Sequence, residues 1–302
     1  MTIMEALQWA NNKLRKAGVD SPMLDAEILL AYCLDTSKAW LFAHFADKLK
    51  SHQEEKFFGL IDRREHREPV AYLVGKKAFY GRDFVVNKHV LIPRPETEVM
   101  VELAVNALAD KDPERALVAD LGTGSGAIAV TLAAETHLPV IAIDIDTEAL
   151  TVAKKNAEVL ALETTVEFQA GNLAEPIIRI FKTIRGSTNV QTSSVYPFKT
   201  LVVAANLPYL SEVSMDNLQA EVRHEPELAL RAGVDGLDAY WELFRQLRTD
   251  RKILPRELIV FIEIDPEQRQ AAEKLILHNF PSAKLETHQD LHGDDRVIEV
   301  HI

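Results

Sequence analysis

The chain has 302 residues, more than a single domain usually holds, so one large domain or two unequal domains are expected. Its hydrophobic fraction of 47% and charged fraction of 26% are those of a folded globular protein, which excludes a disordered or collagen-like chain. The 34 Lys and Arg against 46 Asp and Glu give a formal net charge of −12, which argues against a surface built for nucleic acid.

The single cysteine and the N-terminal segment bear on location. Cys33 has no partner for an intrachain disulfide and lies in the apolar run AEILLAYCL, which fits a buried thiol in a reducing compartment. The N-terminus lacks the apolar core of a signal peptide, and no run approaches the ~20 apolar residues of a membrane span. We therefore expect a cytoplasmic protein, neither secreted nor membrane-inserted, that acts as a monomer.

Residues 1 to 75 predict a small helical domain. Three helix starts are visible: a capping box at Thr2 and Glu5, Ser21 as a cap before Pro22, and a second box at Ser51 and Glu54. Behind these starts, apolar residues fall on one face of each helix: Leu7, Ala10 and Leu14; Leu24, Ile28 and Ala31; Phe57, Leu60 and Ile61. Such faces can pack together as a bundle.

Charge is distributed unevenly along the chain. Lys48 to Arg94 holds eleven Lys or Arg against six Asp or Glu, while the rest is strongly acidic. A solvated face is the simpler interpretation of this stretch, and a surface for an acidic partner is the other.

The pattern changes after the helical domain. Ala78–Leu91 predicts a hairpin turning at Gly81, within a linker of residues 76–94. Residues 95–302 then alternate helical stretches with short apolar runs: LVADL, IAIDI, VEFQA, LVVAAN, ELIVFIEI and RVIEVHI. This alternation predicts an α/β domain whose parallel sheet is covered on both faces. The polar segment Gly186–Ser194 is predicted to be a surface loop.

A glycine-rich turn is the first candidate for ligand binding. The segment ADLGTGSGA (119–127) follows an apolar strand and opens a helix, so glycines let the backbone approach a ligand while amides point outward. Gly122, Gly124 and Ala127 also satisfy the dinucleotide pattern G-x-G-x-x-G/A. This motif alone leaves NAD and S-adenosylmethionine both open.

Asp144 ends the next strand at the carboxyl edge of the predicted sheet. A carboxylate there can accept hydrogen bonds from both ribose hydroxyls of a nucleoside. Asp146 competes for that role, but with Thr147 it is better placed to cap the following helix. We assign the ribose to Asp144.

The sequence Asn206-Leu207-Pro208-Tyr209 follows the strand LVVAA at the same edge of the sheet. The side-chain carbonyl of Asn206 and the backbone carbonyl of Leu207 could each accept one N–H of a planar NH2 group and aim its lone pair at a methyl donor. Pro208 restricts the loop, and Tyr209 could pack on a planar substrate. An Asn-x-Pro turn that simply leaves a strand is the alternative interpretation.

These segments occur together, in order, with several others, and most of the chain resembles the HemK/PrmC family of protein-(glutamine-N5) methyltransferases. That family modifies the Gly-Gly-Gln motif of class I peptide chain release factors, which act in translation termination. The residues that carry the resemblance are Glu68–Gly75, Phe79–Gly81, Val90–Glu98, Asp120–Gly126, Asn206–Tyr209, Glu225–Pro226, Asp235–Leu237, Glu263–Ile264 and Asp295–Val297.

The resemblance implies a Rossmann-like class I S-adenosylmethionine methyltransferase fold with a seven-stranded, mostly parallel sheet whose last strand is antiparallel. It implies domains at 1–75 for release-factor recognition, 76–94 as a hairpin linker and 95–302 for catalysis. Its S-adenosylmethionine-binding residues would be Gly122, Thr123, Gly124, Ser125, Gly126, Asp144, Asn172, Leu173 and Asn206. The glutamine would be held by Asn206, Leu207, Pro208 and Tyr209, and Pro93–Thr97 would lie beside the cofactor.

The chain departs from the family pattern at a few positions. Leu207 replaces the first proline of Asn-Pro-Pro-Tyr, and Asn-Leu-Pro-Tyr is also similar to the motif of ribosomal RNA adenine dimethyltransferases. Asn172 stands where an aspartate is usual and carries no charge. Asp265 stands where glycine is common, and the polar loop before the catalytic strand is longer than expected.

Three other functions compete with glutamine methylation: an adenine-N6 methyltransferase acting on RNA or DNA, an NAD-dependent oxidoreductase, and a cofactor-binding module without catalysis. The acidic balance makes nucleic acid a less suitable partner than a release factor. His66, His137, His224 and His292 lack metal-ligand spacing, and neither a CxxC motif nor a nucleophile elbow is present, so we expect neither a metal site nor a hydrolase.

Overall fold

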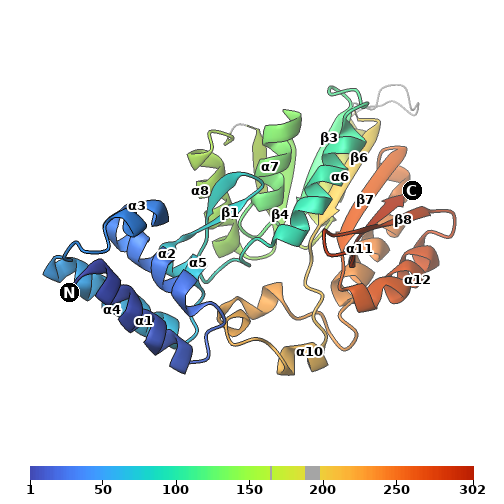
Figure 1. Cartoon of the computed structure of the whole chain (residues 1–302). Coiled ribbons are helices and arrows are strands. Elements are labelled where there is room, and N and C mark those ends of the chain that lie inside the picture. The colour runs from blue at the N-terminus through green and yellow to red at the C-terminus, as the bar shows by residue number, and fades with distance from the viewer. Residues whose placement is uncertain (164, 188–197) are drawn as a thin grey trace. The chain divides into compact units, whose positions relative to one another are not determined.

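A computed structural model describes residues 1–163, 165–187 and 198–302 of the chain (Figure 1). The chain divides into two compact units. The first comprises Met1–Lys76 together with Gln219–His224, and the second comprises Lys77–Leu218 and Glu225–Ile302.

The first unit is a helical bundle, as the sequence predicted. Its helices are α1 (Ile3–Lys16), α2 (Pro22–Leu34), α3 (Lys38–Ala43), α4 (Ser51–Glu65) and α5 (Val70–Val74), with a 3-10 turn η2 (Val222–His224). Helices α1, α2 and α4 pack on one another around side chains that include Leu14, Leu29 and Phe57, all fully buried.

Two of the three predicted helix starts need correction. The capping box of Thr2 and Glu5 is present. Ser21 precedes α2, with Pro22 at its first position, but the Ser21 side chain makes no capping hydrogen bond. The box predicted at Ser51 and Glu54 is wrong, because α4 begins one residue earlier than that box requires. There the Lys50 N–H donates to Gln53 Oε1 at 2.9 Å, and the Glu54 carboxylate instead pairs with the N-terminal amine.

The predicted apolar face of α2 is also partly wrong. Leu24 is 43% exposed, and the buried face runs through Ala26, Leu29 and Leu30 together with Asp25. The helix is apolar on most sides, so the pattern of apolar residues could not identify which side faces the core.

A buried ion cluster explains why the core face of α2 carries an acid. Arg64 on α4 is 5% exposed and donates to Asp25 and to Glu221, at 2.7 and 2.8 Å. Arg67 donates to both oxygens of Glu221, at 2.7 Å each. Burial alone would raise the pKa of Glu221, but the hydrogen bonds from Arg67 and Arg64 outweigh it and lower the pKa to about 2. Part of the basic charge in Lys48–Arg94 is therefore used inside the unit.

The second unit opens with the predicted hairpin, which is a two-stranded sheet of β1 (Lys76–Phe79) and β2 (Arg82–Val85). Its turn consists of Tyr80 and Gly81, both at positive φ (47° and 73°), the conformation that a tight hairpin turn requires. Phe79 and Phe84 are buried and lie with their ring centroids 6.0 Å apart, so the hairpin carries its own part of the core.

The main sheet has seven strands in the order β5-β4-β3-β6-β7-β9-β8. These are β3 (Ala116–Leu121), β4 (Val140–Asp144), β5 (Val166–Ala170), β6 (Thr200–Ala205), β7 (Glu257–Glu263), β8 (Lys284–Gln289) and β9 (Asp295–His301). The five strands β3 to β7 pair in parallel, and β9 runs antiparallel to both β7 and β8. The predicted mostly parallel sheet with an antiparallel last strand is confirmed.

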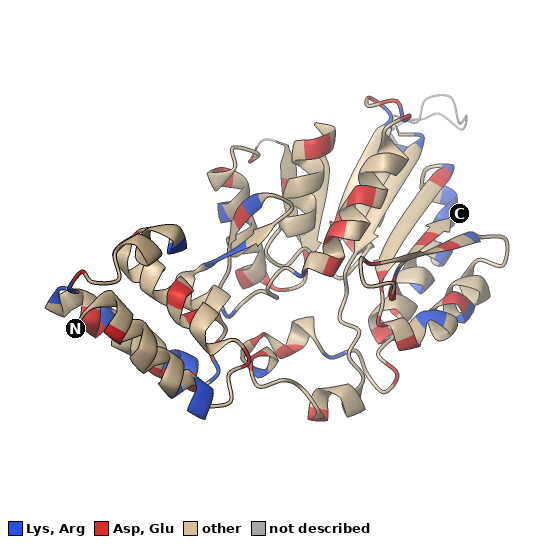
Figure 2. Ribbon diagram, in the orientation of Figure 1, with Lys and Arg blue, Asp and Glu red and all other residues tan. Residues whose placement is uncertain are grey.

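Helices cover both faces of this sheet. Helices α6 (Glu98–Leu108), α7 (Ala127–Thr136) and α8 (Thr147–Val159) contribute to one core cluster, and α9 (Glu175–Ser187), α11 (Asp238–Thr249) and α12 (Arg269–Asn279) to the other. The remaining elements are α10 (Glu212–Asp216) and the 3-10 turns η1 (Pro95–Thr97), η3 (Glu227–Ala229), η4 (Arg251–Ile253) and η5 (Pro266–Gln268). Acidic residues occur along α6, and residues of both signs of charge occur on α12 (Figure 2).

Two sequence predictions concern the ends of this unit's elements. Asp146 caps α8, as predicted, by accepting from the Glu148 N–H at 2.8 Å. The surface loop predicted for 186–194 is wrong at its start, because Gly186 and Ser187 end α9, and its residues 188–194 lie outside the described residues. No helix in the described part of the chain is long and apolar enough to cross a membrane.

Candidate functional site

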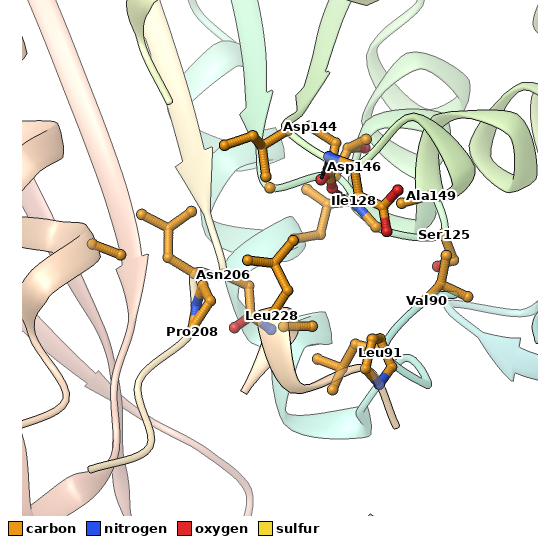
Figure 3. Close-up of a pocket in the computed structure, with 18 of the residues that line it drawn as sticks. Val90, Leu91, Ser125, Ile128, Asp144, Asp146, Ala149, Asn206, Pro208 and Leu228 are labelled. Atoms are coloured by element: carbon orange, nitrogen blue, oxygen red, sulfur yellow. Dashed lines mark hydrogen bonds between the residues drawn. The ribbon is translucent and has the colours of Figure 1, made fainter. Parts of the chain in front are cut away.

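A cavity of about 610 Å³ lies in the second unit, at the carboxyl ends of β3, β4 and β6. This is the edge where parallel sheets bind ligands, and the volume falls in the range of about 300–1,000 Å³ typical of small-molecule sites. Asp144 lies on one side of the cavity and Asn206 on another, with Val90 and Leu91 completing the wall (Figure 3).

The glycine turn forms part of the cavity wall. Residues Gly122 to Ser125 line it, whereas the predicted Gly126 does not, because it is the N-cap of α7 and lies against Ala153 of α8. Gly122 and Thr123 donate their N–H groups to the Ile143 carbonyl, at 2.8 and 2.9 Å, so the turn is fastened to the next strand.

A buried carboxylate sets the shape of this turn. Asp120 Oδ2 accepts from the Thr123 hydroxyl at 2.6 Å and from the Ala129 N–H at 3.0 Å. Burial raises the pKa of the Asp120 carboxyl to about 7, although these two hydrogen bonds oppose the rise. The acid in the motif therefore supports the backbone that the ligand meets and is not itself among the residues that line the cavity.

Asp144 lines the cavity at the end of β4. Its Oδ2 accepts from the Gly124 N–H at 2.8 Å, and its Oδ1 accepts from the Asp146 N–H at 2.9 Å. Burial raises the pKa of Asp144, with those two backbone hydrogen bonds opposing the shift. Each carboxylate oxygen has a second lone pair, so the group can hold the turn and still accept from a ligand hydroxyl.

Asn172 and Leu173 also line the cavity, after β5. Leu173 has a φ of 54°, a conformation that branched side chains rarely adopt. Gly171 precedes them where a Cβ would lie 2.4 Å from Pro176. This turn is therefore held in an uncommon conformation directly at the wall of the cavity.

Asn206 follows β6 and occupies a part of the wall close to Thr97. Its Nδ2 donates to the Thr97 hydroxyl oxygen at 3.0 Å. Its Oδ1 is buried and has no hydrogen-bond partner among the described residues. An unpaired buried carbonyl costs about 1–3 kcal/mol, so this acceptor suits a ligand that donates an N–H or O–H.

Leu207 links three parts of the site. Its N–H donates to the buried Tyr240 hydroxyl at 3.2 Å, and that hydroxyl also lies 3.2 Å from the Ala205 carbonyl and donates to the Glu263 carbonyl. Its side chain packs on the glycine turn, because a Cβ on Gly122 would lie 3.0 Å from Leu207 Cδ2. Leucine at this position keeps a backbone N–H that proline would lack.

Pro208 lines the cavity, but Tyr209 is not among the lining residues. Tyr209 packs on the core cluster to which α9, α11 and α12 contribute. Burial raises its pKa, so its hydroxyl stays neutral at ordinary pH. The predicted stacking of Tyr209 on a planar substrate stays a prediction, and in this structure the ring supports the loop from behind.

The structure accounts for Asp265, a departure from the family pattern. Asp265 Oδ1 accepts from the Glu267 N–H at 3.0 Å and begins the turn η5. That turn places Gln268 so that its Nε2 donates to the Tyr209 carbonyl at 2.8 Å and to the Asp235 carbonyl at 3.0 Å. Asp265 therefore helps to hold the Asn206–Tyr209 loop in place.

Glu225 fastens the Ile92–Arg94 segment of the cavity wall. Its side chain is 1% exposed, Oε2 accepts from the Ile92 N–H at 3.0 Å, and Oε1 accepts from Arg94 at 2.6 Å. Pro93, Arg94 and Thr97 line the cavity. Glu225 appears in the sequence motif Glu-Pro, but no feature of the sequence indicated that it binds this segment.

Sequence reasoning missed most of the apolar wall. Val90, Leu91, Ile128, Ala149 and Leu228 line the cavity (Figure 3). Leu228 is 59% exposed, so a large apolar side chain stands at the cavity in contact with solvent. Isolated apolar residues in loops carry no periodic signal, and only the motif segments around them pointed to this region.

One group of possible metal ligands lies outside the cavity, on the edge strands β8 and β9. Glu286, His288 and Glu299 bring ligand atoms within 4.8 Å of one another. Glu299 already bonds to His288 and His301, at 2.9 and 2.7 Å. The hydrogen bond between His288 and Glu299 therefore accounts for the closeness of two of its three members.

The chain is similar to known proteins over nearly its whole length. A family model described as the PrmC N-terminal domain matches residues 5–75, and one described as a methyltransferase domain matches residues 114–184. The release factor glutamine methyltransferase of Bacillus subtilis is 38% identical over 301 residues, covering 98% of this chain and 96% of that protein. The chain belongs to the release factor glutamine methyltransferase family. The Bacillus anthracis protein of the same name is 36% identical over 304 residues, covering 99% of this chain and 98% of its own length.

A solved structure shares the fold of this family member. The catalytic domain of hMettl16, solved with a hairpin from the MAT2A 3'UTR, aligns with a TM-score of 0.51 at 14% identity, covering 83% of this chain and 81% of that one. At that identity the likeness concerns the fold alone. The strand order, the matched methyltransferase domain and this shared fold together confirm the predicted fold class.

Proposed function

We propose that this family member transfers a methyl group from S-adenosylmethionine to the side-chain nitrogen of a glutamine in a class I peptide chain release factor. The observation that carries the proposal concerns Asn206 in the cavity wall: its buried Oδ1 has no hydrogen-bond partner within the described part of the chain. Relatives that align over nearly the whole chain are named for this reaction.

The cavity suits the proposed methyl donor. Asp144 can accept from ribose hydroxyls, the Gly122–Ser125 turn permits close backbone approach, and Asn172 offers a neutral donor and acceptor beside the apolar wall. S-adenosylmethionine bound there would supply a methyl group activated by its positively charged sulfur. Asp120 and Asp144 both hold the turn in place before any ligand arrives.

The proposed chemistry rests on orientation. Asn206 Oδ1 and the Leu207 carbonyl each accept one N–H of the glutamine amide, which leaves the nitrogen lone pair directed at the methyl carbon. The N–C bond forms as the S–C bond breaks, and the nitrogen then gives up one proton to water. Because an amide nitrogen is a weak nucleophile, fixed acceptors contribute more here than a general base would.

The other parts of the chain have roles in the proposed reaction as well. We propose that the first unit recognises the release factor, that residues 76–94 link it to the catalytic domain of 95–302, and that the enzyme acts as a monomer in the cytoplasm. The matched PrmC N-terminal domain supports the first of these roles.

Mass spectrometry tests the proposal directly. A purified class I release factor is incubated with the protein and S-adenosylmethionine. Fragment ions from the modified release factor then locate any added methyl group. We expect one methyl on the glutamine of Gly-Gly-Gln, loss of transfer in Asn206→Ala, and full transfer in the control Asn106→Ala, which changes an exposed asparagine of α6. Methylation of RNA adenine without any methyl on the release factor would contradict the proposal.

A further inference from the structure

A buried asparagine lies behind the glycine turn and has no role in the function proposed above. Asn156 is on α8, is 0% exposed and does not line the cavity. Its Oδ1 accepts from the Val85 N–H at 2.7 Å, and its Nδ2 donates to the Val85 carbonyl at 3.0 Å and to the Ser125 carbonyl at 2.8 Å. Both hydrogens of the NH2 group are thereby used, so the amide is fixed in one orientation.

These hydrogen bonds join two parts of the cavity wall. Ser125 belongs to the glycine turn and lines the cavity (Figure 3). Val85 ends β2, and the chain that continues from it enters the cavity wall at His89. Because one side chain binds both segments, their spacing at the cavity depends on Asn156.

The Ser125 carbonyl needs this donor because its usual helical partner is engaged elsewhere. In an α-helix a carbonyl accepts from the N–H four residues later, which for Ser125 is the N–H of Ala129. The Ala129 N–H instead donates to Asp120 Oδ2 at 3.0 Å. Helix α7 therefore starts with the hydrogen bond from the Val130 N–H to the carbonyl of its N-cap, Gly126, at 2.9 Å. The neighbouring helix α8 supplies the donor that α7 does not.

The turn has another arrangement available if that donor is lost. Gly126 has a φ of 80°, a left-handed conformation that keeps Ser125 out of the helix, but glycine can also adopt the helical φ. Without Asn156, the Ser125 carbonyl could turn back to the Ala129 N–H and lengthen the start of α7. The turn would then present its backbone amides in other directions.

Helix α8 also restrains the turn sterically. Ala153 lies so close to the turn that a Cβ on Gly126 would be 3.0 Å from the Ala153 Cβ. Ala153 and Asn156 are three positions apart and lie on the same face of α8. They contact successive residues of the turn, Gly126 and Ser125.

From this geometry we propose that Asn156 is a positioning residue that acts through Ser125 and Val85 to hold the glycine turn and the hairpin in the arrangement that binds S-adenosylmethionine. The proposal rests on the proposed function for the identity of that ligand. Loss of the amide should weaken cofactor binding and leave the methyl-transfer step, once both substrates are bound, nearly unchanged.

Two variants of purified full-length protein test the role of the amide. Asn156→Asp keeps the acceptor for the Val85 N–H but places a carboxylate against two carbonyl oxygens, and Asn156→Ala removes all three hydrogen bonds. We expect calorimetric titration to give a Kd for S-adenosylmethionine at least about tenfold higher in both, while kcat at saturating concentrations of both substrates stays within about threefold. A wild-type Kd in both variants would overturn the proposal.

The matched control is Asn279→Ala, which changes a buried asparagine of α12. Asn279 is 4% exposed, donates to the Leu275 carbonyl of its own helix and does not line the cavity. This variant also loses a buried side-chain hydrogen bond, yet its Kd for S-adenosylmethionine should stay within about twofold of wild type. Equal weakening of cofactor binding in Asn279→Ala would assign the effect to lost stability alone and overturn the positioning role.

Hydrogen exchange followed by NMR needs neither ligand nor methyl transfer. In wild type the Thr123 N–H donates to the Ile143 carbonyl and the Gly126 N–H to the Thr123 carbonyl. Because the turn loses its fixed form, we expect both amides to exchange at least about tenfold faster in Asn156→Ala. Wild-type exchange rates at both positions would contradict the proposal.

A last measurement uses wild-type protein alone. Bound S-adenosylmethionine should slow the exchange of the Val85 N–H, although Val85 does not line the cavity, because Asn156 joins it to the turn. An unchanged rate on cofactor binding would overturn the proposal. A wild-type protein that binds S-adenosylmethionine but leaves release factors unmethylated would contradict the proposed function alone.

Discussion

The hydroxyl of Tyr240 offers a sharp test of how the Asn206–Tyr209 loop is held. Tyr240 is fully buried in α11, and burial raises its pKa well above the usual value, so the hydroxyl stays neutral and keeps its proton. It accepts from the Leu207 N–H and donates to the carbonyl of Glu263. The change Tyr240→Phe removes this oxygen and keeps the ring.

The expected cost can be worked from these contacts. Leu207 is 2% exposed, so its N–H would be left buried without an acceptor, which costs about 1–3 kcal/mol. We expect the free energy of unfolding to fall by about 2 kcal/mol. For a protein of this size class that corresponds to a Tm about 4–8 °C lower, at roughly 2–4 °C per kcal/mol. The change also removes the hydrogen bond that fixes the Leu207 backbone in the Asn206–Tyr209 loop. We therefore expect kcat for methyl transfer to fall by a larger factor than KM rises.

Urea denaturation and calorimetry of wild type, Tyr240→Phe and the control Tyr32→Phe measure the first effect. Tyr32 is 41% exposed, so its change should leave Tm within about 1 °C, as surface substitutions usually do. Steady-state methylation of a release factor measures the second effect. A Tyr240→Phe protein with wild-type Tm and wild-type kcat would refute the reasoning about Leu207.

Further outcomes follow from other buried contacts. Glu225→Ala leaves a buried backbone N–H and Arg94 without their acceptor, and urea denaturation should show a loss of about 2–4 kcal/mol, whereas an unchanged midpoint would contradict the anchoring role. The pKa of Glu221 is about 2 in the folded protein against an ordinary value of 4.5, so its stabilising contribution is present above pH 4.5 and lost as the pH falls towards 2. In Glu221→Gln the urea midpoint should therefore change less between pH 5 and pH 3 than in wild type; equal changes would assign the acid sensitivity elsewhere. Gly236 has a φ of 76°, and in Gly236→Ala the new Cβ would lie 2.2 Å from the Tyr209 carbonyl oxygen. Both Tm and kcat should therefore fall. A wild-type Tm would show that the Asn206–Tyr209 loop can move away from the new Cβ without loss of stability.

The sequence indicated most of the sheet because six of its strands are short apolar runs at regular intervals. It did not indicate β8, whose sequence KLETHQ is mostly polar and which, at the sheet edge, contains no buried residue. An edge strand buries little apolar surface, so its hydrophobic signal is weak, and polar residues there are typical. The family resemblance supplied the count of seven that periodicity could not.

Helix boundaries show the same limit at a finer scale. Thr2 with Glu5 was found because both partners of the box are of the expected type, whereas Lys50 at the start of α4 has no capping preference. In α2 the buried partner of Arg64 is Asp25, and a long-range ion pair cannot be read from local pattern. Tertiary contacts decided both cases.

In the site, motifs located the turn at Gly122 and the loop at Asn206, and the structure places both at one cavity. The residues that hold these motifs were not foreseen. Glu225, Tyr240 and Gln268 act through hydrogen bonds to groups far away in the sequence. Such contacts produce no periodic or local pattern in the sequence. The sequence could therefore identify the groups that contact a ligand, but not the residues that hold those groups in place.

The contact between Gly122 and Leu207 limits how far these two motifs can vary. The two residues belong to motifs 85 residues apart in the chain, yet a Cβ at 122 would come within 3.0 Å of the Leu207 side chain. The φ of 72° at Gly122 also strains any L side chain, so even a smaller residue at 207 would not admit one at 122. Position 122 is therefore closed twice over, by its backbone conformation and by its neighbour from the other motif.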